Sequence, residues 1–401
     1  MNMKRLTFKS TLILILCLLL VGLRPLPVLR AENSSISTHA RAAALIDVES
    51  GRLLYSSRGD EPMLIASLTK IMTAIVAIEN GDLTSKVKVG KNAFAKEGSS
   101  LFLKQGEEMK LEDMLYGMML RSGNDAATAI AEHVGGSEQG FVYLMNQKAE
   151  ELGLTHSHFA NPHGLDAEGH YSSANDLAVL TAYALHNPVF KEIVKTQEKT
   201  ADNPYEKWDY KWSNKNKMLR LYEGADGVKT GYTKKALRCL VSSATRNGQQ
   251  LVAVTINDGN DWNDHASLLN FGFNHYPLKT LIERGEGISG YSYVTSKSFA
   301  YPLGQGEEAR LFTKLELKRE AAVPKQARSS DFGLKGVLVL QLGGQEIGRV
   351  PVYEPEQLPP EQSAYTKKYS AALAPAYPAG NWLQALGSAL RALFQRGDNH
   401  D

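Results

Sequence analysis

Pro62-Met-Leu-Ile-Ala-Ser-Leu-Thr-Lys-Ile-Met-Thr-Ala74 is the stretch that decides the fold. Its apolar residues continue to Ile78, and Gly81 follows as a stop signal. This spacing predicts a buried helix that ends near Gly81.

Ser67 and Lys70 lie near the beginning of this helix, three positions apart, so on a helix they share one face and can touch. A charged lysine is expensive to bury, and a neutral lysine beside a serine hydroxyl is a base beside a nucleophile. The alternative is a surface serine next to a lysine whose charged end reaches the solvent. Ser-x-x-Lys also recurs at 85–88, in an alternating run typical of a solvated edge strand.

The segments on either side of this helix predict strands that form one sheet. Residues 41–48 and 51–56 form a hairpin, and four helices follow, at 111–120, 125–134, 140–152 and 173–185. A second hairpin signal, 239–245 and 251–256 around Asn247-Gly248, comes after 227–231, and a helix follows around 265–271. Strands at both ends of a helical middle indicate an α/β sheet that is built from distant parts of the chain and flanked by helices.

The texture changes from about Gly285, where short strands predict a small all-β domain. The last apolar stripe, between Trp382 and Phe394, follows a segment rich in proline and alanine, so it either lies in a membrane interface, which we favour, or packs back on a domain. The expected organisation is a leader at 1–31, a catalytic domain at 32–284, an all-β domain at 285–354, a linker at 355–380 and an amphipathic helix at 381–396.

The N-terminus and the composition place the protein outside the cytoplasm. Lys4, Arg5 and Lys9 precede a short apolar core at 11–23, which is typical of an export signal, although an uncleaved anchor stays open. Lys and Arg total 45 against 43 Asp and Glu, and this balance excludes a nucleic-acid binder. Without the leader one cysteine remains, Cys239, so no internal disulfide is expected.

Four histidines lie close together in a loop rich in Asn, Pro and Gly: His156, His158, His163 and His170. They lack helical i,i+4 spacing and any cysteine partner, so we expect structural or solvated histidines and no metal site.

A second motif, Arg121-Ser122-Gly123-Asn124-Asp125, lies between two predicted helices. A small polar loop between apolar helices can deliver side chains into a cleft. Ser122 could relay a proton there, and Asn124 could bind an amide or orient Lys70. The alternative is a helix N-cap, since Ser and Asn both favour that position.

A third motif, Lys229-Thr230-Gly231, begins a predicted strand. Lys229 supplies a positive potential, and Thr230 supplies a hydroxyl that can bind a carboxylate. Gly231 lets a ligand approach the strand closely, and the next N–H, of Tyr232, can point at an oxyanion. Alone, the motif could be an ordinary turn.

The three motifs occur in the order that serine penicillin-recognising enzymes share. With them, the chain resembles the low-molecular-weight penicillin-binding proteins of the D-alanyl-D-alanine carboxypeptidase type, serine peptidase family S11. The resemblance covers roughly 41–353, and the matching stretches are 66–73, 120–127, 161–166, 171–178 and 224–233.

The resemblance implies a β-lactamase-like transpeptidase fold with a helical subdomain, followed by a small all-β domain and a C-terminal amphipathic helix. It implies an exported protein at the outer face of the cytoplasmic membrane, held there by that helix, or one secreted to the cell wall. The expected partners are peptidoglycan stem peptides that end in D-Ala-D-Ala, β-lactam antibiotics and the membrane surface, without a cofactor.

The resemblance also implies the role of each motif residue. Ser67 is the acyl-ester nucleophile, Lys70 its base, Ser122 the proton relay to the leaving group, and Asn124 a catalytic partner. The N–H groups of Ser67 and Tyr232 form the oxyanion hole, and Lys229, Thr230 and Thr233, with Gly231 between them, bind substrate.

The sequence departs from the family pattern at two places. Leu237 stands where the family has a glycine, and the stretch 257–264, where some relatives carry an arginine for the substrate carboxylate, has no cation. A β-lactamase or an endopeptidase on the same fold, or a catalytically weak wall-binding protein, stays an alternative. A vegetative and a spore-cortex role fit equally.

Overall fold

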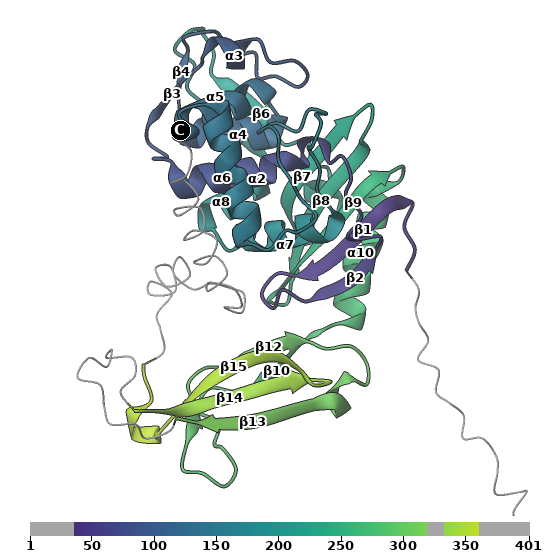
Figure 1. Cartoon of the computed structure of the whole chain (residues 1–401), viewed down its shortest axis with the longest axis vertical. Coiled ribbons are helices and arrows are strands. Elements are labelled where there is room, and N and C mark those ends of the chain that lie inside the picture. The colour runs from purple at the N-terminus through teal and green to yellow at the C-terminus, as the bar shows by residue number, and fades with distance from the viewer. Residues whose placement is uncertain (1–35, 319–332, 361–401) are drawn as a thin grey trace, which may run out of the picture. The chain divides into compact units, whose positions relative to one another are not determined.

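A computed structural model of the chain describes residues 36–318 and 333–360 (Figure 1). The expected leader at 1–31, the expected helix at 381–396 and residues 361–380 of the expected linker lie outside the described residues. None of the helices within 36–318 and 333–360 combines the length and the apolar composition that a membrane crossing requires.

The central element is a five-stranded antiparallel sheet in which segments from both ends of the first 260 residues meet. Its order is β2 (Leu53–Ser57), β1 (Ala40–Asp47), β9 (Gln249–Asp258), β8 (Leu237–Arg246) and β7 (Ala225–Thr233). The predicted pairing of N-terminal and later strands is therefore confirmed, since β1 pairs with β9 along almost its whole length. β7 is an edge strand.

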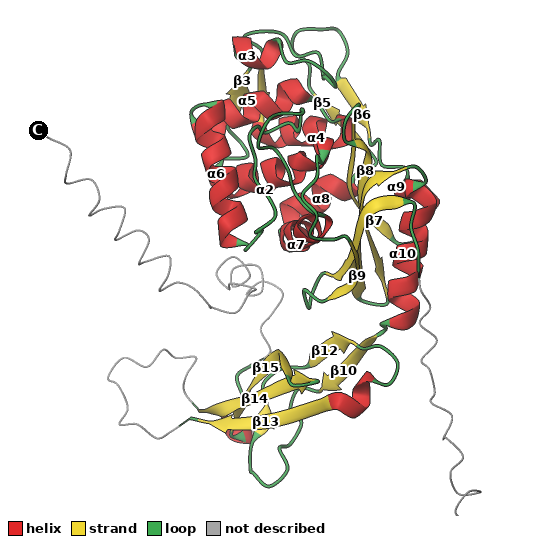
Figure 2. Cartoon of the chain, turned by 45° about the vertical axis from the view of Figure 1, so that its right-hand side comes forward, coloured by secondary structure: helices red, strands yellow, loops and turns green. Residues whose placement is uncertain are grey.

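The two faces of this sheet are covered by different helices. Alternate residues such as Ala44 and Val254 join the main core with the helical region, where α7 (Ala174–Leu185) and α8 (Pro188–Lys195) pack on the sheet. The residues between them face α10 (Asp261–His275), since Leu45 and Leu251 both lie against Gly272. Figure 2 shows α10 on one side of the sheet and the helices α2 and α4 to α8 on the opposite side.

The helical region carries the first two motifs. Its long helices are α2 (Lys70–Asn80), α4 (Leu111–Arg121), α5 (Asn124–Gly135) and α6 (Glu138–Glu151), together with α7 and α8. Short elements complete it: η1 (Ala66–Thr69), β3 (Lys86–Lys88), α3 (Lys91–Phe94), β4 (Glu108–Lys110), β5 (Glu198–Ala201), β6 (Tyr210–Ser213) and α9 (Met218–Leu221).

The start of the first helix and the presence of α8 differ from the sequence prediction. The first helix begins at Lys70, and Ser67 lies in the preceding 3-10 turn, because Ala66 has a left-handed backbone with φ 49° and cannot continue a helix. α8 was not predicted. Asn187-Pro188 suggested a helix end, whereas the Asn187 side chain caps α8 by accepting from Val189 N at 2.9 Å, and Pro188 occupies its first position.

The C-terminal part of the described chain consists of strands around a small core of its own. β10 (Leu278–Ile282) pairs with β12 (Phe299–Pro302), and a second sheet has the order β11 (Val294–Thr295), β15 (Gln345–Tyr353), β14 (Leu334–Leu342) and β13 (Leu311–Leu317). Two short 3-10 turns, η2 (Glu307–Arg310) and η4 (Pro355–Gln357), complete it. Because β10 already pairs with β12, we propose that this unit begins at Leu278 rather than at 285.

Candidate active site

Ser67 sits in a turn that the backbone holds under strain. Ala66, the residue before it, is left-handed, a conformation that costs an L-residue about 1–2 kcal/mol. The loop at Gly164 packs directly on this turn, and a Cβ at Gly164 would lie 1.9 Å from the Ala66 carbonyl oxygen. Thr69 Oγ1 donates to the same oxygen at 2.9 Å. Only glycine at 164 therefore allows the turn that presents Ser67.

Lys70 is the most informative residue of the site, because its ammonium group is completely buried. Its Nζ lies 3.1 Å from Ser67 Oγ, 2.7 Å from Asn124 Oδ1 and 2.6 Å from the carbonyl oxygen of His163. The last two atoms can only accept hydrogen bonds. A neutral amine has two protons for them and one lone pair left, and that lone pair faces the Ser67 hydroxyl.

The surroundings of Lys70 favour this neutral form. Burial lowers the pKa of Lys70 well below its usual value, and the nearby positive charge of Lys229 lowers it further. Asp125 opposes the effect. No hydrogen bond joins a carboxylate to Nζ within the described residues, so the amine meets only neutral acceptors at close range.

The loop that follows α4 fixes the acceptor beside Lys70. Asn124 Nδ2 donates to the carbonyl oxygen of Glu97 at 2.7 Å, which leaves Oδ1 turned toward Lys70. The buried carboxylate of Asp125 accepts from Leu101 N at 2.9 Å and from Leu103 N at 3.2 Å. Asp125 thereby holds the loop that covers this helix junction.

Ser122 and Lys229 form a second contact pair in the site. Ser122 ends α4 with a left-handed backbone, φ 68°, and its hydroxyl oxygen accepts from Lys229 Nζ at 3.1 Å. Lys229 Nζ also donates to the carbonyl oxygen of Thr230 at 2.8 Å. Burial, with a smaller contribution from Lys215, lowers the pKa of Lys229 to about 7. At neutral pH, Lys229 is therefore protonated in only part of the molecules.

The edge of β7 closes the site opposite the helix junction. A Cβ on Gly231 would lie 3.2 Å from the backbone nitrogen of Ser67, so a side chain here would press on the Ser67 turn, which approaches the strand closely. Beyond it, Tyr232 is 64% exposed. The Thr233 hydroxyl accepts from Ala236 N and donates to Asp166 Oδ1, both at 2.9 Å.

The structure thus brings the residues of the three motifs together in pairs. Lys70 joins Ser67 to Asn124, Lys229 joins Ser122 to the third motif, and Gly231 packs against the Ser67 turn. Sequence reasoning missed the His163 carbonyl and Asp125. A backbone carbonyl carries no sequence signal, whereas the position of Asp125 directly after Asn124 could have drawn attention to it.

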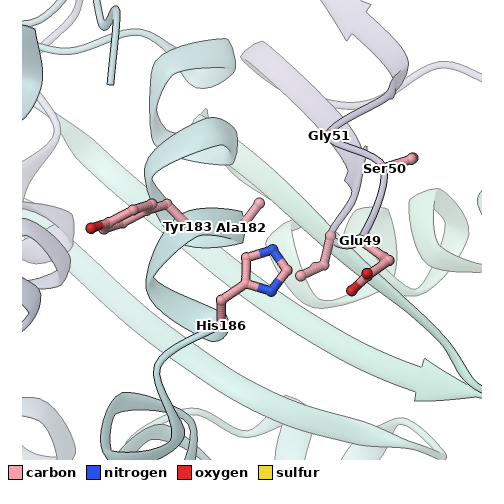
Figure 3. Close-up of a pocket in the computed structure, with 7 residues that line it drawn as sticks. Glu49, Ser50, Gly51, Ala182, Tyr183 and His186 are labelled. Atoms are coloured by element: carbon pink, nitrogen blue, oxygen red, sulfur yellow. The ribbon is translucent and has the colours of Figure 1, made fainter. Parts of the chain in front are cut away.

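Two histidines of the neighbouring loop lie close to this arrangement. His170 is buried, and its Nε2 lies 2.8 Å from Thr69 Oγ1, whereas the ring of His163 lies 3.6 Å from Glu138. Burial lowers the pKa of His170 to about 4, so this ring is neutral near pH 7. A separate small pocket between the β1–β2 turn and the end of α7 shares no residue with the site (Figure 3).

Comparisons with known proteins agree with this geometry. The model of the Peptidase S11 family, described as D-alanyl-D-alanine carboxypeptidase, matches residues 29–260. The D-alanyl-D-alanine carboxypeptidase DacF of Bacillus subtilis is 33% identical over 348 residues, which cover 82% of this chain and 88% of DacF.

Two solved structures extend the similarity to the fold. One is the D-alanyl-D-alanine carboxypeptidase DacD from Francisella tularensis, with a TM-score of 0.63, 25% identity, and coverage of 83% of this chain and 96% of that one. The other is penicillin binding protein 5 from Haemophilus influenzae, with a TM-score of 0.64, 26% identity, and coverage of 80% and 97%.

Proposed function

The chain belongs to the D-alanyl-D-alanine carboxypeptidase family S11, and we propose that it removes the terminal D-alanine from peptidoglycan pentapeptides through an acyl-enzyme on Ser67. One observation carries the proposal above the others: Lys70 Nζ lies 3.1 Å from Ser67 Oγ, with its other two partners fixed as acceptors. A serine peptidase needs a base at this position.

In the acylation step, the Ser67 hydroxyl gives its proton to the Lys70 amine while Oγ attacks the carbonyl carbon between the two D-alanines. The negative charge that develops on the carbonyl oxygen is met by the N–H groups of Ser67 and Tyr232, and such donors contribute about 3 kcal/mol each. The close approach of the Ser67 turn to Gly231 supports this pairing of donors from two elements.

The bond between carbonyl carbon and nitrogen then breaks, and the leaving D-alanine takes a proton that Lys70 received, passed on through Ser122. Lys229 donates to the Ser122 oxygen, which leaves the hydroxyl hydrogen of Ser122 free to point at the leaving amine. Water hydrolyses the acyl-enzyme and restores the Ser67 hydroxyl. β-Lactams acylate Ser67 in the same way, but their leaving amine stays tethered to the acyl group.

We place the reaction outside the cytoplasm, because residues 1–31 read as an export signal. The stripe of leucines and aromatic residues at 381–396 would hold the enzyme on the outer surface of the membrane. A β-lactamase needs in addition a base that activates water efficiently against the acyl-enzyme, and no carboxylate contacts Ser67 Oγ or Lys70 Nζ within the described residues. This favours the carboxypeptidase.

The test compares the wild type with Ser67→Ala on three substrates: a wall pentapeptide, a cross-linked peptide dimer and a fluorescent penicillin. We expect D-alanine release from the pentapeptide and one equivalent of stable penicillin label in the wild type, and neither in the variant. Label that survives in Ser67→Ala would overturn the assignment of the nucleophile. Cleavage of the dimer as fast as the pentapeptide would favour an endopeptidase, and rapid penicillin turnover a β-lactamase.

A further inference from the structure

β7 presents its third-motif residues to two different faces of the sheet. Lys229 and Gly231 pair with Val241 and Cys239, which belong to the main core on the helical side. Thr230 pairs with Leu240, on the other face. That face is the α10 side, because Ser242, two residues along β8 from Leu240, bonds to His265 of α10 at 2.5 Å.

Arg238 lies on this same α10 side, directly opposite Tyr232 on β7. Its Nε donates to Asp261 Oδ2 at 3.1 Å, and its Nη2 donates to Asp261 Oδ1. The Asp261 side chain is 6% exposed and begins α10, whereas the Arg238 side chain is 44% exposed. Asp261 therefore fixes one edge of the guanidinium group, and Nη1 has no hydrogen-bond partner within the described residues.

Thr230 lies on the same face of the sheet as Arg238. Residues diagonal to each other on paired strands have Cα atoms about 7–8 Å apart, within reach of a long side chain, and Thr230 is diagonal to Arg238. No hydrogen bond of the Thr230 hydroxyl occurs in the part of the chain that the structure describes. Two unused donors, one of them charged, thus share one face beside the open edge of β7.

Two other residues of this strand, Lys229 and Thr233, are already engaged. Lys229 points to the opposite face, where it bonds to Ser122, and its pKa of about 7 leaves it only partly charged. The Thr233 hydroxyl is engaged with Asp166 and with the turn at Ala236. A dipeptide that ends in a free carboxylate needs a full positive charge at its end, and an arginine keeps its charge at all relevant pH values.

We propose that Arg238, together with the Thr230 hydroxyl, holds the terminal carboxylate of the substrate, and that Asp261 is the positioning residue for this guanidinium. The inference rests on the proposed function and names the specificity determinant of that site. Arg238, on β8, supplies the cation that residues 257–264 lack. Nη1 and the second hydrogen of Nη2 face the carboxylate, and Thr230 donates to its other oxygen.

The competing explanation is that Arg238 and Asp261 form only a structural ion pair between β8 and α10. Such a pair would act on stability, and its loss would affect every ligand of the enzyme alike. A carboxylate site affects only those ligands that carry the negative charge. Two forms of one acylating compound therefore separate the explanations.

The experiment measures the second-order rate constant for acylation by a penicillin and by its methyl ester, in wild type, Arg238→Ala, Arg238→Lys and Asp261→Asn. We expect Arg238→Ala to slow the free acid about 10–100-fold and the ester less than about 3-fold, because only the acid uses the charge. Arg238→Lys should recover part of the lost rate with the free acid. The rate of Asp261→Asn with the free acid should lie between those of Arg238→Lys and the wild type.

Arg246→Ala is the matched control, since Arg246 lies at the other end of β8 and stacks on Tyr222. It should leave the rates with both compounds unchanged. Equal slowing of acid and ester in Arg238→Ala, or no slowing of either, would overturn the proposal. Ester acylation that persists in Arg238→Ala and vanishes in Ser67→Ala would show that the nucleophile assignment stands independently of the carboxylate site.

Discussion

The cations Lys70, Lys229 and Arg238 lie on the two faces of β7, which hold them in opposite ways. On the helical side, Lys70 and Lys229 are buried and meet only neutral oxygen atoms at close range. On the α10 side, Arg238 is 44% exposed and binds the carboxylate of Asp261. Burial without a counter-charge removes a proton from an amine, whereas exposure with a carboxylate partner keeps the charge.

The residue types fit this division of labour. A lysine changes its pKa readily when it is buried, so it can serve as a base near neutral pH, whereas a guanidinium stays charged and offers several donors in one plane. A proton acceptor, Lys70, and a fixed positive charge, Arg238, can therefore lie on opposite sides of a substrate along the edge of β7. The alternation of side chains along β7 turns Lys229 toward the first side and Thr230 toward the second.

The largest effect is expected when Lys70 receives a carboxylate partner, as Arg238 has in Asp261. Asn124→Asp places a carboxylate where Asn124 Oδ1 now lies 2.7 Å from Lys70 Nζ. The pKa of Lys70 then rises, and we expect penicillin acylation at pH 7 to fall about 100-fold or more, because the amine is protonated. The acylation rate at pH 6–10, measured with a fluorescent penicillin, checks this.

The rate of Asn124→Asp should recover toward alkaline pH, where the amine loses its proton. Asn263→Asp, an exposed change on α10, is the control and should leave the rate unchanged. A variant that is as fast as the wild type at pH 7 would contradict the claim that Lys70 must be neutral.

A smaller effect is expected on the free energy of unfolding, which the burial of Lys229 lowers. The folded-state pKa of Lys229, about 7, lies below its usual value of 10.5, so the unfolded chain binds more protons between these two values and unfolding is favoured there by lower pH. We expect Lys229→Met to be more stable than the wild type by about 1–3 kcal/mol at pH 6, with the difference shrinking as the pH rises toward 10. Urea unfolding of both proteins at pH 6 and at pH 10 measures this difference in stability.

Lys211→Met is the control for this comparison, because the Lys211 side chain is 65% exposed and burial does not oppose its charge. It should change stability little at either pH. A Lys229→Met variant that is less stable than the wild type at pH 6 would show that the bonds from Lys229 to Ser122 and Thr230 outweigh the burial cost.

Periodicity was enough to predict most of the fold. The hairpin at β1–β2, the pair β8–β9, the helices α4 to α7 and the strands β13 to β15 follow from apolar spacing and turn residues. α8 was missed because Pro188 breaks a preceding helix and begins a following one equally well. β3 was predicted from the alternation at 85–88, whereas its partner β4 and the pair β5–β6 have no clear pattern of their own.

The sequence predicted those parts of the site that side chains form. It did not predict the parts that backbone groups form. The three motifs named the side chains that the structure brings together. The His163 carbonyl, the strained Ala66 turn and the contact with Gly164 arise from tertiary packing. Arg238 was missed because the cation was sought after the last core strand, whereas the register between β7 and β8 places it opposite Tyr232.

Leu237 shows a departure from the family pattern in physical terms. The glycine expected at this position would suit the left-handed backbone that the structure has there, φ 59° at Leu237. The chain accepts a strained leucine at the turn between β7 and β8, and its side chain is 43% exposed.

The pH dependence of Ser67 acylation by penicillin in the wild type tests the central claim most directly, that Lys70 is a neutral base. If burial lowers the pKa of Lys70, the rate constant rises along an acidic limb and reaches its plateau well below the ordinary lysine pKa of about 10.4. A rate that still climbs about tenfold per pH unit between pH 8 and pH 10 would show a lysine with its ordinary pKa and contradict the account.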